Sequence, residues 1–221
     1  MKRRTFLLST PAAAAALGGC SNLVTAPPEP AKNYKINLLH KGPPAIKYSS
    51  VQRGCRTCDA FESLYVEEET LLSSDHPPIR RWRDQVFSLR DLSQLEQVEG
   101  VNTAVNRDIR YESDYRHWHV RDKWGFPVES LEEGGDCEDF ALLKFESLKL
   151  LGWSEEAMMV LVGVSDFNGK KESHATLLVE MEDRSQLVLD SLTDFISPPR
   201  DDHHFYPMYG INPAGYYHVE V

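Results

Sequence analysis

The spacing of apolar residues changes once along the chain, and this change limits the folds that the chain can adopt. From Phe140 to Leu151 apolar side chains recur every three or four residues, as in a helix, and Gly152 ends the pattern. Beyond it the period is two in MMVLVGVS, SHATLLVEME and QLVLDSL, with a turn at Asn168 and Gly169. Helices followed by an antiparallel meander predict an α+β domain in which N-terminal helices and the helix ending at Gly152 pack on the sheet.

Two further helices are expected before this one, and a loop separates them from it. DHPPIRRWRDQVFSLRD has prolines at a helix start, and apolar residues recur from Leu92 to Ile109 at helical spacing. Residues 110–130 are polar and aromatic, and we expect them to form a loop.

The first 20 residues have the layout of an export signal. A basic start precedes an apolar stretch from Thr5 to Leu17, and small residues precede Cys20. LGGC resembles the lipobox of bacterial lipoproteins, whose cysteine carries lipid, and RRTFL resembles a twin-arginine signal. A plain membrane anchor is less favoured, because the apolar run is too short to span a bilayer comfortably. We expect an exported, lipid-anchored protein on the periplasmic face, and Ser21 after the lipidated cysteine favours the outer membrane.

Three segments are expected after the signal: a flexible tether (21–50), an extension with Cys55 and Cys58 (51–75), and one domain (76–221). In an oxidising compartment the CRTC pair favours a local disulfide. A zinc site would need two more ligands, and a thioredoxin-like redox site would need a βαβ pattern around it. The net charge of -10, without clustered Lys and Arg, argues against a nucleic-acid partner.

Cys137 stands in GGDCEDF, at the expected start of a helix. Unpaired N–H groups and the helix dipole lower a cysteine pKa there, whereas neighbouring acids oppose the thiolate. His174 lies in a predicted strand and Asp190 closes the next one, so the two side chains could meet across the sheet as base and orienting group. The alternative is a core histidine and an aspartate that starts a turn.

These motifs together resemble the bacterial transglutaminase-like cysteine proteinases, and most closely their LapG-type periplasmic members, which release surface adhesins. The segments are GDCEDFALLKFESLKLLG, SHATLLV and LVLDSL, with VNRDIRYESD, DKWGFPVESL and YGINPAGYY, so the resemblance spans about residues 76–221. It implies a papain-like, transglutaminase-like fold with Cys137 as nucleophile, His174 as base and Asp190 as orienter. It also places Trp124 near the site, where its indole N–H could serve the oxyanion hole.

The resemblance also implies a Ca²⁺ ion beside the nucleophile, held by Asp136, Glu138 and Asp139. A hard cation prefers carboxylate oxygens, and it would cancel the negative field that opposes the Cys137 thiolate. The alternative is that these acids cap the helix, with Asp136 as N-cap and Asp139 three residues on. The two roles are compatible if they use different oxygens.

The function implied is that of a membrane-tethered periplasmic cysteine endopeptidase. Its substrate would be an exported protein such as a large surface adhesin, and its inhibitor the periplasmic domain of a cyclic-di-GMP receptor. Protein acyl transfer by the same three residues, or binding without catalysis on the same scaffold, remain alternatives. Histidines at 117, 119, 203 and 204 could bind a metal, although loop positions are the simpler explanation.

Mass spectrometry of the mature, unreduced protein tests the expectations for the N-terminal cysteines. We expect the chain to begin at a lipidated Cys20 and Cys55 to be linked to Cys58, so that Cys137 is the one free thiol. An unmodified peptide that starts before Cys20 would contradict the lipid anchor, and three free thiols would contradict the disulfide.

Overall fold

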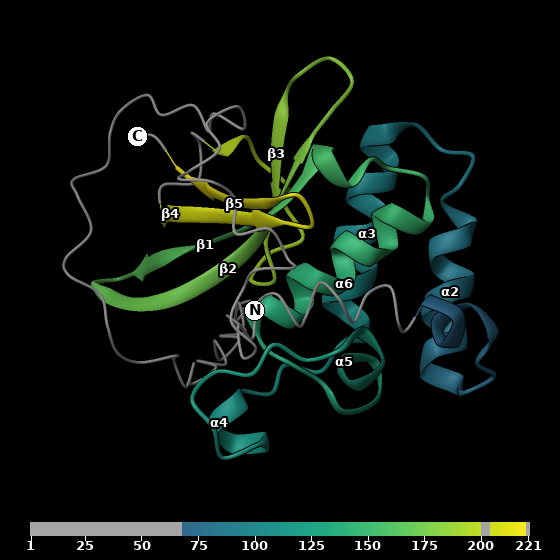
Figure 1. Cartoon of the computed structure of the whole chain (residues 1–221), viewed down its shortest axis with the longest axis horizontal. Coiled ribbons are helices and arrows are strands. Elements are labelled where there is room, and N and C mark those ends of the chain that lie inside the picture. Colours follow the sequence, from purple (N-terminus) through teal and green to yellow (C-terminus); the bar gives the residue numbers. More distant parts are fainter. Residues whose placement is uncertain (1–67, 200–203, 220–221) are drawn as a thin grey trace, which may run out of the picture.

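Helices come first in the chain and strands follow, as the change in apolar spacing predicts (Figure 1). The computed structural model describes residues 68–199 and 204–219, so the predicted signal and tether, and Cys20, Cys55 and Cys58, lie outside the described residues. After a helical stretch at 68–73, the helices are α2 (Pro77–Ser88), α3 (Gln94–Asp108), α4 (Asp114–His117), α5 (Pro127–Glu133), α6 (Cys137–Leu150) and the 3₁₀ turn η2 (Glu155–Ala157). The strands are β1 (Met158–Phe167), β2 (Lys170–Glu180), β3 (Gln186–Leu189), β4 (Phe205–Asn212) and β5 (Gly215–His218). The α+β class is confirmed.

The strands form one antiparallel sheet in the order β3-β2-β1-β4-β5. β1, β2 and β3 are the predicted meander, and positive φ angles of 56° at Asn168 and 81° at Gly169 form the tight turn that this residue pair favours. The sequence analysis assigned no strand to β4 and β5, which form a second hairpin on the other side of β1. Pro207 interrupts the strand pattern in the sequence of β4, because proline is disfavoured inside strands. It pairs with Gly163 of β1, at the point where the register shifts between Val162 and Gly163.

The helix α6 is buried along almost its whole length. Every residue from Cys137 to Leu148 is buried, and α6 contacts α2, α3 and α5 as well as β1 and β2 (Figure 1). Trp82 of α2 donates a hydrogen bond from Nε1 to Ser147 Oγ of α6 at 2.9 Å. A helix buried on all sides is stabilised by packing, and a fully buried side chain such as Phe145 contributes about 2–3 kcal/mol. The packing of α6 thus holds its first residue, Cys137, at one end of the core.

Residues 110–130 are not a plain loop, as the sequence analysis expected, because they contain α4 and α5. These helices have 4 and 7 residues, too few for an apolar period to be recognised. Pro127 stands in the first turn of α5, and the Glu129 carboxylate accepts a hydrogen bond from the Phe126 N–H at 3.2 Å. The two short helices bring the polar residues of this segment to the start of α6.

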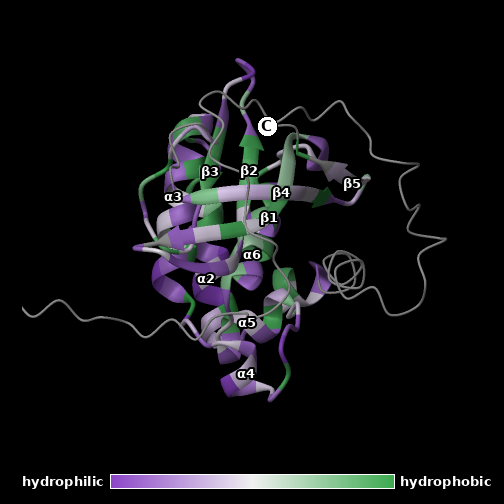
Figure 2. Ribbon diagram, turned by 90° about the vertical axis from the view of Figure 1, so that its left-hand side faces the viewer, coloured by the Kyte–Doolittle hydropathy of each residue, from purple (hydrophilic) through white to green (hydrophobic). Residues whose placement is uncertain are grey.

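Apolar residues lie on both faces of the sheet (Figure 2). The main core lies between the sheet and the helices, and it includes Leu71, so the helical layer begins before residue 76. A smaller cluster on the other face consists of Met159, Leu161, Leu178, Val188, Phe205 and Tyr217. Across the described residues, no helix has the length and apolar character needed to cross a bilayer.

Candidate active site

Cys137 is the first residue of α6, as the sequence predicts, and its side chain is 8% exposed. Two glycines bring the chain into the helix. Gly134 has φ +96°, and a Cβ on Gly135 would lie 2.3 Å from Asp139 Oδ2, so neither position accommodates a larger residue without a shift. The Gly135 N–H donates to the Arg110 carbonyl at 3.1 Å, which ties the approach to α6 to the preceding segment.

The Asp139 carboxylate joins three parts of the chain at this point. Its Oδ2 accepts from the Asp136 N–H at 3.0 Å and its Oδ1 from the Gly125 N–H at 2.7 Å. Both oxygens are therefore used within the protein, as the capping alternative expects. Burial, and secondarily the charge of Asp136, raise the pKa of Asp139 to about 8. Asp139 also lies with Asp114 and Asp136 in a group whose candidate ligand atoms are within 4.8 Å of one another, so it caps the helix and remains among the candidate metal ligands.

His174 and Asp190 meet across β2 and the end of β3, as the sequence predicts. His174 Nε2 lies 2.9 Å from Asp190 Oδ1, which also accepts from the Leu192 N–H at 2.9 Å, and both side chains are buried. Because Nε2 faces the carboxylate, Nδ1 is the ring nitrogen left for a thiol. The Phe205 ring packs edge-on against the imidazole, with centroids 5.7 Å apart.

Gly163 allows the sheet to close opposite His174. The two residues are paired in the β1–β2 ladder, and a Cβ at Gly163 would lie 2.1 Å from the Tyr206 carbonyl of β4. The glycine thus admits the close approach of β4 that brings Phe205 to the His174 ring.

The thiol lies between this pair and a group of acids. Cys137 Sγ donates to Glu138 Oε2 at 3.1 Å, and the charge of His174 acts on the neighbouring Asp136. The helix α6 packs against β2, the strand that carries His174. The first turn of α6, the imidazole and the acids therefore belong to one site.

Carboxylates from two segments gather beside Cys137. Asp136 and Glu138 of α6 meet Asp114 of α4 and Asp122 of the following loop, in groups whose candidate ligand atoms lie within 4.8 Å of one another. The Asp114 N–H donates to Asp136 Oδ2 at 3.3 Å, whereas Asp136 Oδ1 is buried without a hydrogen-bond partner in the described part of the chain. Sequence reasoning missed Asp114 and Asp122. Their signal was that Asp114 ends the segment VNRDIRYESD and Asp122 begins the segment DKWGFPVESL, both of which belong to the family resemblance.

The crowding of these acids disfavours their charged forms. Burial raises the pKa of Asp114 to about 7, with further contributions from Asp136 and Asp122. Burial also raises the pKa of Asp136. Several oxygens, one of them unsatisfied, in a buried acidic group fit the ligand preferences of a hard divalent cation.

Trp124 is half-buried against the main core, directly before Gly125, which donates to Asp139. The structure thus places its segment at the start of α6, and the oxyanion role remains a prediction.

Two of the four loop histidines, His117 and His204, have other partners, and His203 lies outside the described residues. His117 Nε2 lies 2.8 Å from Glu133 Oε2, and His204 Nδ1 lies 3.1 Å from the Asp166 carbonyl. No histidine of residues 68–199 or 204–219 joins the acidic groups.

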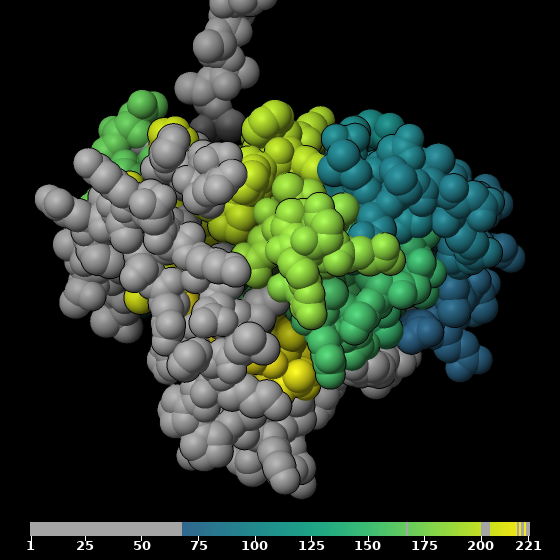
Figure 3. Space-filling model, turned by 90° about the horizontal axis from the view of Figure 1, so that it is seen from above, coloured from purple at the N-terminus to yellow at the C-terminus, as the bar shows by residue number. Residues whose placement is uncertain are grey.

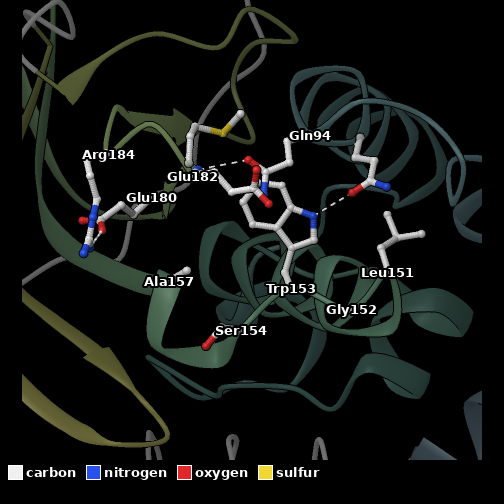
Figure 4. Close-up of a pocket in the computed structure, with 11 residues that line it drawn as sticks. Gln94, Leu151, Gly152, Trp153, Ser154, Ala157, Glu180, Glu182 and Arg184 are labelled. Carbon is white, nitrogen blue, oxygen red and sulfur yellow. Dashed lines mark hydrogen bonds and ion pairs between the residues drawn. The ribbon is translucent and has the colours of Figure 1, made fainter.

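A pocket of about 610 Å³ lies at the other end of α6 (Figure 4). Trp153 and Gln97, joined by a 2.8 Å hydrogen bond, line it together with charged residues of the β2–β3 hairpin, Glu180, Glu182 and Arg184. With a rise of about 1.5 Å per residue, α6 separates this pocket from Cys137 by roughly 20 Å. The pocket is therefore not part of the catalytic centre.

Comparisons with known proteins show a family and similar folds. The family model of the bacterial transglutaminase-like cysteine proteinases (BTLCP) matches residues 80–209. Calcium-bound LapG of Legionella pneumophila is similar in structure, with a TM-score of 0.59, 25% identity, and coverage of 72% of this chain and 88% of that one. EGTA-treated LapG of the same organism gives a TM-score of 0.59, 26% identity, and coverage of 72% and 86%. No curated protein sequence matches the chain.

Replacing Asp139 by Ala tests its capping role. We expect the free energy of unfolding to fall by about 2 kcal/mol, because two buried N–H groups lose their acceptor. The matched control is Glu96→Ala, which removes the equivalent residue of an exposed capping box at Ser93 and should cost less. Equal losses in urea denaturation would contradict the role of Asp139 as a buried link.

Proposed function

Because the chain belongs to the bacterial transglutaminase-like cysteine proteinase family, we propose that it is a calcium-dependent endopeptidase with a Cys137–His174–Asp190 triad. The family match makes it a cysteine proteinase. The observation that carries the assignment of residues is the buried 2.9 Å contact between His174 and Asp190, together with Cys137 on the helix that packs against the His174 strand.

The geometry supplies each group that peptide cleavage needs. His174 takes the proton of Cys137, and the thiolate attacks the peptide carbonyl carbon. The first-turn N–H groups of α6 point toward the oxygen that becomes negative, and the Trp124 indole is a second candidate donor. His174 then protonates the leaving amine, which departs and leaves a thioester on Cys137. Water, deprotonated by His174, attacks the thioester, and the carboxylic acid product and free thiol are released.

Asp190 has the orienting role in this scheme. Its Oδ1 contacts His174 Nε2 and leaves Nδ1 for the thiol. A buried carboxylate also stabilises the imidazolium that forms after proton transfer.

The acidic group beside Cys137 is the proposed calcium site. The candidate oxygens come from the predicted ligands Asp136, Glu138 and Asp139, joined by Asp114 and Asp122. The unsatisfied Asp136 Oδ1 is the observation that fits a cation best. Bound Ca²⁺ would supply positive charge that offsets the carboxylates. Glu138, once engaged as a ligand, would compete less with His174 for the Cys137 proton. The similarity to a LapG that binds calcium supports the same proposal.

Location, substrate and regulator are proposed from the sequence and the family resemblance. The export signal and the LGGC motif support a lipid-anchored enzyme on the periplasmic face, with the outer membrane favoured. A proteinase acts on proteins, and resemblance to the LapG type supports an exported adhesin as substrate. The periplasmic domain of a cyclic-di-GMP receptor is the corresponding candidate inhibitor. Co-expression with a candidate adhesin tests the substrate: an adhesin retained equally with wild type and Cys137→Ala is not cleaved by this enzyme.

Replacement of the triad residues tests the catalytic assignment. We expect Cys137→Ala to abolish cleavage of a protein substrate and His174→Ala to lower kcat/KM by about 10³-fold or more. Asp190→Ala should cost less than His174→Ala, because it removes orientation and not the base. Cleavage that persists in a folded Cys137→Ala protein would refute the assignment, and amine incorporation without cleavage would favour acyl transfer.

Calorimetric titration of metal-free protein, beside a cleavage assay, tests the calcium site. We expect Ca²⁺ to bind and to restore activity lost in chelator, better than Mg²⁺, which prefers smaller octahedral sites. Asp136→Asn and Asp114→Asn should weaken binding by about tenfold or more. Glu129→Gln is the matched control, because this carboxylate lies on nearby α5 but pairs with Lys123. Full activity in chelator with no heat of binding would mean that the acids have a structural role alone.

A further inference from the structure

Two asparagines of α3 hold the turn that carries Asp190 by hydrogen bonds. Asn106 Nδ2 lies within hydrogen-bond distance of the Asp190 carbonyl (3.0 Å), the Thr193 carbonyl (2.9 Å) and Asp194 Oδ1 (3.1 Å). One turn earlier, Asn102 Nδ2 donates to the Thr193 carbonyl at 3.1 Å. Viewed from above, the yellow-green segment after β3 lies against the teal α3 (Figure 3). Asn106 thus fixes the main chain of Asp190 directly, whereas Asn102 reaches only the far side of the turn.

A buried lysine of α6 acts electrostatically on the same turn. The Lys144 side chain is 0% exposed, and its Nζ has no hydrogen-bond partner in the described part of the chain. Burial lowers the pKa of Lys144 to about 7, whereas the charges of Asp190 and Asp194 act in the opposite direction. An isolated buried ammonium destabilises a fold, and an apolar side chain of similar length would remove that penalty. A lysine at this position therefore points to a function.

The charge of Lys144 acts on the ionisation of the Asp190 carboxylate. Burial alone would raise the pKa of Asp190, but His174, the Leu192 N–H and Lys144 together outweigh burial, and the pKa is lowered. His174 of β2 and Lys144 of α6 are the charged groups that act on this carboxylate. The nucleophile and this cation belong to one helix, seven positions apart, so the position of Lys144 is tied to that of Cys137.

We propose that Asn106 and Lys144 are positioning residues: Asn106 holds the main chain of Asp190, and Lys144 keeps its carboxylate ionised. Together they keep His174 oriented toward Cys137. This inference rests on the proposed triad.

The rate at which iodoacetamide alkylates Cys137 reports how well His174 activates the thiol, and it can be measured without knowledge of the substrate. The full chain is treated in the presence of Ca²⁺, and the rate is followed by mass spectrometry of the peptide that contains Cys137. A wild-type rate no faster than that of His174→Ala would mean that the proposed triad itself is wrong. A fast wild-type rate makes the variants below a test of this inference alone.

For Lys144→Met, we expect stability in urea to be equal or higher, while the alkylation rate falls about tenfold below pH 7. The sign of the pH effect follows from Lys144: it is protonated below its pKa of about 7 and neutral well above it, so the difference from wild type should shrink as pH rises. Lys149→Met removes another cation of α6, one paired with Glu68 and Glu146, and should leave the rate unchanged. A Lys144→Met protein as reactive as wild type at every pH would overturn the role of Lys144.

For Asn106→Ala, we expect the alkylation rate to fall about tenfold, whereas Asn102→Ala should lower it by less than about twofold. Both variants remove a hydrogen bond to the same turn, so both should lose stability. Only Asn106 contacts Asp190. Rates that fall equally, in proportion to lost stability, would overturn the role of Asn106. If Asn106→Ala does not fold, Lys144→Met decides the proposal.

Discussion

The unpaired N–H groups at the buried start of α6 are the constraint on which the site depends. A helix start inside a protein must find acceptors for these groups, and here the Asp139 carboxylate accepts from Asp136 and also from Gly125. One side chain therefore fixes the helix and the segment that follows Trp124. The same first turn holds Cys137, whose reactivity depends on the N–H groups and dipole there.

The acids around the nucleophile show how function and stability oppose each other in this fold. Asp114, Asp136 and Glu138 are buried together, and burial raises the pKa of the two aspartates. Lys144 adds a buried cation whose charge acts on Asp190. An apolar core of the same shape would be more stable, but it would offer neither a cation site nor a charged neighbour for the Asp190 carboxylate.

The sheet contributes rigidity to the part of the site that must not move. His174 lies on β2, where its main chain pairs with Gly163 of β1, and β3 pairs with β2 from Leu177 onward. Gly163 lets β4 come close enough for Phe205 to pack on the imidazole. A ring packed against Phe205 and bonded to Asp190 has little freedom to turn away from the thiol.

The sequence by itself determined the elements whose residues are close together in the chain. The change in period gave the order of helices and strands, and Asp136 with Asp139 three residues on indicated a helix start beside Cys137. His174 and Asp190 could be paired in advance because successive strands of a meander lie side by side. These features depend on local conformation, which leaves a repeating signature in the sequence.

Only the tertiary structure decided which distant residues complete the site. Asp114 joins Asp136 across 22 positions, and Asn106 reaches Asp190 across 84. Lys144 recurs with the apolar residues of the predicted helix, but only the packing of α6 on all sides shows that its charge is buried beside the site. Contacts of this kind follow from how helices and sheet pack, and packing leaves no period in the sequence because each contact is made once.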